Sequence, residues 1–91
     1  MPRRGDAPDP VAAAFGAAVR ERREARNETL EDVAGRIPAA AKRSQPRGQP
    51  TKMNPKYLSE IERGWHAPSI VTAQRLAEAL EVPLADLVRD L

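Results

Sequence analysis

Hydrogen-bonding side chains are concentrated in the segment PKYLSEIERG, residues 55–64. Its apolar members Leu58 and Ile61 are three positions apart, as on the buried stripe of a helix, so the polar side chains around them should point to solvent. Their ammonium, guanidinium, hydroxyl and carboxylate groups can donate or accept hydrogen bonds at a polar surface. The candidate binding residues of this segment are Pro55, Lys56, Tyr57, Ser59, Glu60 and Arg63.

A second group of polar side chains lies just before this segment. Residues 38–53, PAAAKRSQPRGQPTKM, contain four cations, three prolines and no acid, and predict a long loop. The whole chain carries a net charge of only +2, so the rest of it is net negative by two. The loop is either a solvated linker or a phosphate-binding segment. Its candidate phosphate-binding residues are Lys42, Arg43, Arg47 and Lys52.

The residue types needed for catalysis or metal binding are scarce. The chain has no cysteine and a single histidine, His66, so neither a thiolate zinc site nor a polyhistidine site can form. It has no glycine-rich phosphate loop and no nucleophile beside a base. We therefore expect no enzymatic activity, no metal and no cofactor.

A single small domain must position these side chains, because 91 residues support one core. Only Phe15, Tyr57 and Trp65 are aromatic, so aliphatic residues and alanine must form that core, which favours helices. Residues 1–8 combine proline, glycine and charge and predict a flexible arm; residues 9–91 form the domain. No apolar run has the length of a signal peptide or membrane span, so we expect a cytoplasmic protein.

Capping residues and 3.6-residue periodicity predict five helices and no strand, an all-α fold. Asp9 before Pro10 opens the first, and Thr29 with Asp32 forms a capping box before the second. Asn54 before Pro55 opens the third, which stops at Gly64. The predicted helices cover about 10–26, 30–37, 55–63, 68–80 and 83–91.

The second and third predicted helices are short and well capped, and each has a narrow apolar face. This is the outline of a helix-turn-helix, in which the first helix crosses the DNA backbone and the second enters the major groove. Here the chain resembles the Xre family of phage-repressor-like DNA-binding domains, which includes the lambda repressor and Cro folds. The resemblance covers about residues 15–87 and rests on FGAAVRERREAR, TLEDVA, NPKYLSEIERG and PSIVTAQRLAEALEVPLADL, in that order.

The resemblance implies that the helix after Asn54 is the recognition helix. Lys56 can then donate to a guanine edge or a phosphate, and Glu60 can accept from a cytosine amino group. Tyr57 and Ser59 can reach phosphates or bases. Without the motif, the same residues would be only the solvated face of an amphipathic helix.

The family also pairs an acid of the recognition helix with an arginine of the first helix, which implies a structural ion pair between Glu62 and Arg23. Trp65 and His66 follow Gly64 where the family places backbone contacts to phosphate. Trp65 is either a core residue or a residue that stacks on a sugar. His66 is interpreted as an ordinary surface residue.

Three features depart from the family pattern. Leu30 stands where several members have a glutamine that touches the phosphate backbone. Arg22 and Glu28 occupy positions that are usually apolar, which indicates a thinner core or pairing between charged neighbours. Sixteen residues separate Ile37 from Asn54, whereas a family turn needs only about three or four. The longer closure costs about 1.5 kcal/mol, so the helix pair should survive it.

These features predict a sequence-specific double-stranded DNA-binding regulator of transcription, most simply a repressor acting by operator occupancy. The alternative is an antitoxin or protein-interaction module that binds a partner protein and its own operator. We expect a homodimer on pseudo-palindromic DNA, with half-sites about 34 to 36 Å apart, and no contact with membranes. Val88 and Leu91 are the candidate dimer contacts.

Overall fold

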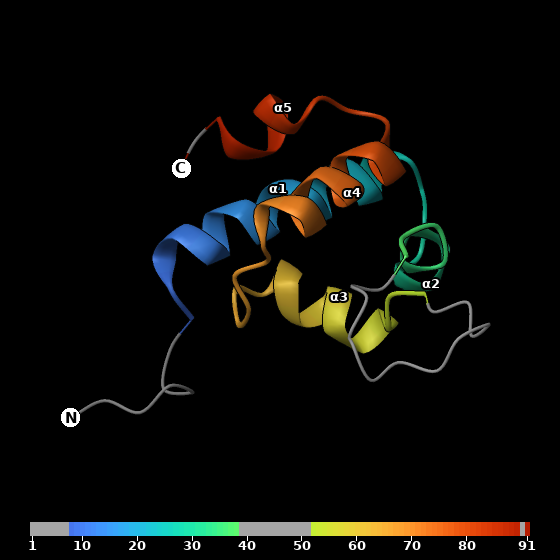
Figure 1. The fold of residues 1–91 in the computed structure, drawn as a ribbon, viewed down its shortest axis with the longest axis horizontal. Coiled ribbons are helices and arrows are strands. Elements are labelled where there is room, and N and C mark those ends of the chain that lie inside the picture. Colours follow the sequence, from blue (N-terminus) through green and yellow to red (C-terminus); the bar gives the residue numbers. More distant parts are fainter. Residues whose placement is uncertain (1–7, 39–51, 90) are drawn as a thin grey trace.

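The computed structural model describes residues 8–38, 52–89 and 91, which form five α-helices and no β-strand (Figure 1). The helices are α1 (Pro10–Ala25), α2 (Leu30–Ala34), α3 (Pro55–Glu62), α4 (Ile70–Leu80) and α5 (Leu84–Val88). The predicted all-α fold of five helices is confirmed. In Figure 1, α1 and α4 run through the middle of the molecule, with α3 on one side of them and α5 on the other. Among the described residues, no helix is long and apolar enough to cross a membrane.

Four of the helices begin at a side chain that accepts hydrogen bonds from the first turn. These capping residues are Asp9, Thr29, Asn54 and Ser69. At α2, the Thr29 hydroxyl accepts from the Asp32 amide and the Asp32 carboxylate accepts from the Thr29 amide, both at 3.0 Å. This is the capping box that the sequence predicts. Such bonds satisfy amides that no carbonyl of the helix can reach.

Helix α2 ends at Ala34 and not at Ile37, where the sequence led us to expect its end. Beyond it, the amides of Arg36 and Ile37 donate to the carbonyls of Val33 and Ala34 at 3.0 and 3.1 Å, so the chain winds more tightly than an α-helix. Pro38 contributes, because proline disfavours the helical conformation of the residue before it. Ile37 is still buried.

Three helix ends share one backbone arrangement, in which a residue with positive φ is followed by an amide that bonds back to the carbonyl five positions earlier. The residues with positive φ are Asn27 (56°), Gly64 (84°) and Glu81 (60°). Gly64 ends α3 as predicted, and it lacks the Cβ that makes this conformation costly. Asn27 and Glu81 adopt the same positive φ although each carries a Cβ.

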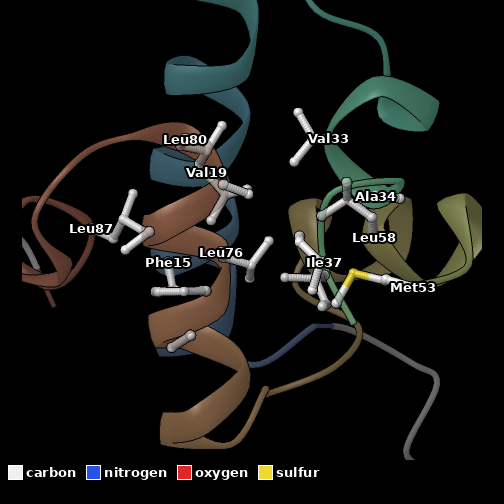
Figure 2. Close-up of a cluster of buried hydrophobic side chains, with 14 residues drawn as sticks. Phe15, Val19, Val33, Ala34, Ile37, Met53, Leu58, Leu76, Leu80 and Leu87 are labelled. Carbon is white, nitrogen blue, oxygen red and sulfur yellow. The ribbon is translucent and has the colours of Figure 1, made fainter. Parts of the chain in front are cut away.

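The core joins side chains from all five helices (Figure 2). Residues of α1, α4 and α5 form one side of it, and residues of α2, α3 and the segments beside them form the other. Its largest members are Phe15, Val19, Val33, Ile37, Met53, Leu58, Ile61, Leu76, Leu80 and Leu87. Trp65 lies beyond the end of α3 and is 41% exposed, so its interpretation as a core residue is wrong. The turn at Gly64 carries it away from the stripe of Leu58 and Ile61.

The two charged residues at usually apolar positions are paired with charged neighbours, as the sequence suggested. Arg22 lies 3.6 Å from a carboxylate oxygen of Asp86 in α5. Glu28 accepts from Arg26 at 2.9 Å and from Arg36 at 2.6 Å. Leu30, the third departure from the family pattern, is partly buried against the core.

The two ends of the 38–53 segment lie side by side. Pro38 and Lys52 form an isolated antiparallel bridge, and the Met53 amide donates to the Ile37 carbonyl at 2.8 Å. The side chains of Ile37 and Met53 are both buried in the core. The chain therefore leaves α2 and returns to α3 at one fixed point.

Candidate functional site

Helix α3 has one buried and one exposed side. Leu58 and Ile61 are fully buried in the core, and Glu62 is 8% exposed. The exposed side carries polar groups: Lys56, Tyr57 and Arg63 are exposed, whereas Pro55, Ser59 and Glu60 are partly exposed. All six candidate residues of this segment thus lie on the helix or at its end, and none belongs to the core.

The buried Glu62 is held by Arg23 of α1. Arg23 donates from Nε to Glu62 Oε2 at 2.8 Å and from Nη2 to Oε1 at 3.0 Å, a bidentate contact between α1 and α3. The side chains of Arg23 and Glu62 are 13% and 4% exposed. The hydrogen bonds with Glu62 raise the pKa of Arg23 further above its usual range. Arg23 also donates to the Glu28 carbonyl at 2.9 Å, which attaches the start of α2 to the same pair.

Two glycines allow α3 to approach α1 more closely than side chains would permit. A Cβ on Gly16 would collide with the Ile61 carbonyl oxygen and would lie 2.7 Å from that of Glu62. A Cβ on Gly64 would lie 2.7 Å from Cα of Ala13. The end of α3 therefore packs directly on the backbone of α1. Sequence reasoning did not identify Gly16, although a glycine inside an alanine-rich helix indicates a packing role.

A second group of charged residues attaches α2 to the rest of the molecule. Glu28, just before α2, accepts from both Arg26 and Arg36, and Arg36 also donates to the Ala79 carbonyl of α4 at 3.0 Å. The hydrogen bonds from Arg36 and Arg26 lower the pKa of Glu28 to about 2. Both ends of α2 are therefore fixed while it packs against α3 and α4.

His66 contacts two candidate residues on the exposed side of α3. Its Nε2 lies 2.8 Å from Glu60 Oε1, and its ring centroid lies 5.0 Å from that of Tyr57, with the planes tilted by 35°. The sequence indicated only a surface position for His66. The contact depends on the turn at Gly64, which folds the chain back beside the helix.

The basic candidates before α3 are only partly within the described chain. Lys52 is exposed and forms the isolated bridge with Pro38. Lys42, Arg43 and Arg47 lie outside the described residues, as do residues 1–7 of the predicted 1–8 arm.

The two candidate dimer contacts lie at an apolar groove of about 330 Å³. Val88 and Leu91 line it together with Val11 of α1 and Ile70 of α4. These four side chains are 37%, 52%, 57% and 72% exposed, respectively. The groove adjoins the turn between α3 and α4 at Ala67 and Pro68, and it is apolar and open to solvent.

Comparison with known proteins places this geometry in a family. Residues 14–91 match a family model described as a helix-turn-helix domain. The solved structure of the clp gene regulator ClgR from C. glutamicum is 28% identical, with a TM-score of 0.70, covering 89% of this chain and 87% of that chain. The restriction-modification controller protein C.AhdI from Aeromonas hydrophila is 26% identical, with a TM-score of 0.64, covering 84% of this chain and 94% of that chain.

A more distant structure, the hypothetical transcription factor NHTF from Neisseria, shares the fold at 19% identity and a TM-score of 0.66, covering 97% of this chain and 80% of that chain. No curated protein matches the chain. Because the family model spans most of the sequence and the solved relatives have the same arrangement of helices, the chain belongs to the helix-turn-helix domain family, with Xre-type regulators as its structural relatives.

Proposed function

We propose that this protein binds a specific sequence of double-stranded DNA and regulates transcription, as a repressor that occupies its operator. In this proposal α3 enters the major groove and α2 crosses the phosphate backbone. Repression by occupancy requires no chemical step. The membership of the helix-turn-helix family and the two solved gene regulators of similar structure support this function.

The observation that carries the proposal is the two-sided construction of α3. Its back is held by the core, by the bidentate pair of Arg23 and Glu62, and by direct packing on the backbone at Gly16. Its front presents polar side chains to solvent. Recognition of base edges needs side chains held in a defined position, and a helix fixed from behind meets that need.

Each exposed side chain of α3 has a suitable counterpart on DNA. Lys56, at the start of the helix, is suited to a guanine edge or a phosphate, and Glu60 to a cytosine amino group. Tyr57 and Ser59 can donate to bases or phosphates. Arg63 lies at the end of the helix, with its Nε 3.4 Å from the Ser59 carbonyl, and would contact the phosphate backbone of the DNA. Lys52 would contact phosphate just before the helix.

The proposal includes a homodimer, because one short recognition helix buries too little surface for useful specificity. The groove lined by Val88 and Leu91 is the proposed contact between the two copies. Exposed apolar surface of this kind is usually covered in a working assembly. A two-fold dimer would place two copies of α3 on half-sites about one helical turn apart.

The function is tested by enrichment of genomic DNA. The purified protein is mixed with genomic fragments, and the recovered fragments are sequenced. We expect wild type to enrich a small set of fragments that share a pseudo-palindrome, and the double variant Lys56→Ala/Arg63→Ala to lose this enrichment. The matched control, Arg75→Ala/Arg89→Ala, removes the same charge from exposed positions outside α3 and should keep it. Equal loss in both variants, or no enrichment by wild type, would contradict the proposal.

A second candidate function is a protein-interaction role, such as an antitoxin that also binds its own operator. The open apolar groove favours it, since a different protein could cover the same side chains. Sedimentation distinguishes the two. A dimer of the purified chain supports the homodimer, whereas a monomer that remains monomeric on DNA favours a groove reserved for another protein.

A further inference from the structure

Three side chains form a cluster on the exposed side of α3, which we call the Glu60 cluster: Tyr57, Glu60 and His66. The imidazole Nε2 of His66 contacts Glu60 Oε1 at 2.8 Å, and its ring lies 5.0 Å from that of Tyr57. Glu60 and His66 side chains are 30% and 44% exposed, so the cluster is open to a ligand that approaches α3.

Glu60 has cations nearer in sequence than His66, yet they do not pair with it. Lys56 stands four positions before Glu60 and Arg63 three positions after it, both spacings at which helical side chains meet. In residues 52–89, however, the ion-pair contact of Glu60 within 4 Å is with His66. Within the part of the chain that the structure describes, the carboxylate of Glu60 is therefore paired through His66, and this contact is an ion pair when His66 holds a proton.

This arrangement matters at a surface that faces phosphates. An unbalanced carboxylate there opposes DNA binding, because like charges repel. A protonated His66 cancels that charge and brings a second N–H, at Nδ1, that can donate to a phosphate oxygen. Histidine is the side-chain type that changes charge between about pH 5 and 8.

We propose that His66 is a further DNA-binding residue, which takes up a proton as DNA binds, balances the charge of Glu60 and holds its Oε1 in place. Glu60 Oε2 is then left to accept a hydrogen bond from a cytosine amino group. The inference rests on the proposed function of α3. It predicts that DNA affinity falls as the pH rises.

The other charged groups around this turn do not supply the same effect. The cations of α3, Lys56 and Arg63, are a lysine and an arginine, residue types that ordinarily change charge only well above pH 8. Asp9, at the start of α1, lines the groove beside Ala67 and Pro68, and its carboxylate caps α1 by accepting from the Val11 and Ala12 amides. The first turn of α4 contains no acidic residue.

The test measures the dissociation constant for an enriched DNA site at pH 6, 7 and 8 and constant ionic strength. We expect it to rise by about threefold to tenfold from pH 6 to pH 8 in wild type, as uptake of up to one proton allows. His66→Gln keeps an amide donor for Glu60 but has no group that titrates in this range, so the dissociation constant of this variant should not vary with pH. Glu60→Gln should vary less than wild type. The control Glu78→Gln, on α4, should behave as wild type.

A second measurement does not depend on variants. The chain contains one histidine, so its ring signals in a proton NMR spectrum of untagged protein belong to His66. Titration with and without DNA should show that His66 keeps its proton to a higher pH in the complex. Equal pH dependence in wild type and His66→Gln, or an unchanged NMR titration, would overturn the inference while leaving sequence-specific binding intact. Failure of wild type to bind DNA at any pH would instead overturn the proposed function.

Discussion

Among the described residues, the exposed side of α3 and the groove beside α5 are two surfaces open to a partner, and they are built in opposite ways. The α3 surface is polar, and the helix beneath it is fixed by a buried ion pair and by backbone packing. The groove is apolar and is lined by side chains from α1, α4, α5 and the residue Leu91 beyond α5, and Val11, Ile70 and Leu91 are each more than half exposed. A polar surface on a fixed helix suits recognition of a defined pattern of hydrogen-bond donors and acceptors, whereas an apolar, open groove suits association with a protein.

The largest effect should follow from removing the ion pair behind α3. Glu62→Ala leaves the Arg23 guanidinium buried without its partner, so we expect the free energy of unfolding to fall by about 3 to 5 kcal/mol. The control is Glu24→Ala, which removes an exposed acid paired with Arg20 and should cost less than about 0.5 kcal/mol. Urea denaturation of both variants checks this. Equal stabilities would show that α3 is not fixed through Glu62.

Gly16→Ala tests the backbone contact between α1 and α3. Alanine is the better helix former by about 1 kcal/mol, but its Cβ has no space against the Ile61 and Glu62 carbonyls. We expect a net loss of about 1 to 3 kcal/mol from overpacking, measured by thermal unfolding. A stabilised variant would mean that the two helices can separate without cost, and that the front of α3 is less firmly positioned than we infer.

Lys56→Ala tests the front of α3 separately from its back. Because Lys56 is exposed, the melting temperature should stay within about a degree or two of wild type. Affinity for an enriched site should fall by about 1 to 3 kcal/mol if Lys56 contacts a base. If Lys56 contacts only a phosphate, affinity for all sequences should fall by a similar factor. The slope of log affinity against log salt concentration should then become shallower by about 1. Fluorescence anisotropy over a series of salt concentrations separates these results.

Leu91→Glu tests the groove. A charge among Val11, Ile70 and Val88 should weaken self-association by about tenfold or more, about 1.4 kcal/mol, and shift sedimentation towards the monomer. Val71→Glu is the matched control, since Val71 is 60% exposed but does not line the groove. Dissociation by both variants alike would mean that the dimer forms through another surface.

The smallest effect concerns the exposed network of Glu28, Arg26 and Arg36. The pKa of Glu28 is lowered from 4.5 to about 2 in the folded protein, so its stabilising contribution is complete above about pH 4.5 and is lost as the pH falls towards 2. We expect the melting temperature of wild type to fall by more between pH 5 and pH 2 than that of Glu28→Gln. Glu31→Gln, an exposed acid of α2, should follow the wild-type curve. If Glu28→Gln and wild type showed the same dependence of melting temperature on pH, the network around Glu28 would not stabilise the position of α2.

Much of this structure was predictable because its signals are local. The helix caps at Asp9, Thr29 and Asn54 depend on side chains two or three residues from the amides that they bind, so sequence spacing reveals them. The stripe of Leu58 and Ile61 also follows from spacing along one helix. The pairing of Arg23 with Glu62 came from the family resemblance, since the two residues are 39 positions apart.

What sequence could not supply depends on where the chain turns. Trp65 continues the spacing of Leu58 and Ile61, but the positive φ of Gly64 removes it from their stripe. The same turn brings His66 beside Glu60, a contact that no periodicity implies. The groove beside α5 depends on the packing of three helices from distant parts of the chain, so Val88 and Leu91 were predictable as exposed side chains but the groove was not.

The closed ends of the 38–53 segment have a consequence for protein engineering. Pro38 and Lys52 are bridged, and Ile37 and Met53 on either side are both hydrogen-bonded and buried, so the spacing of α2 and α3 is set before the chain departs. The length of the segment between Pro38 and Lys52 should then have little effect on stability, since each doubling of its length adds only about 0.6 kcal/mol of loop-closure entropy. A fluorescent domain or an epitope could be inserted at this point, and α3 would keep its position.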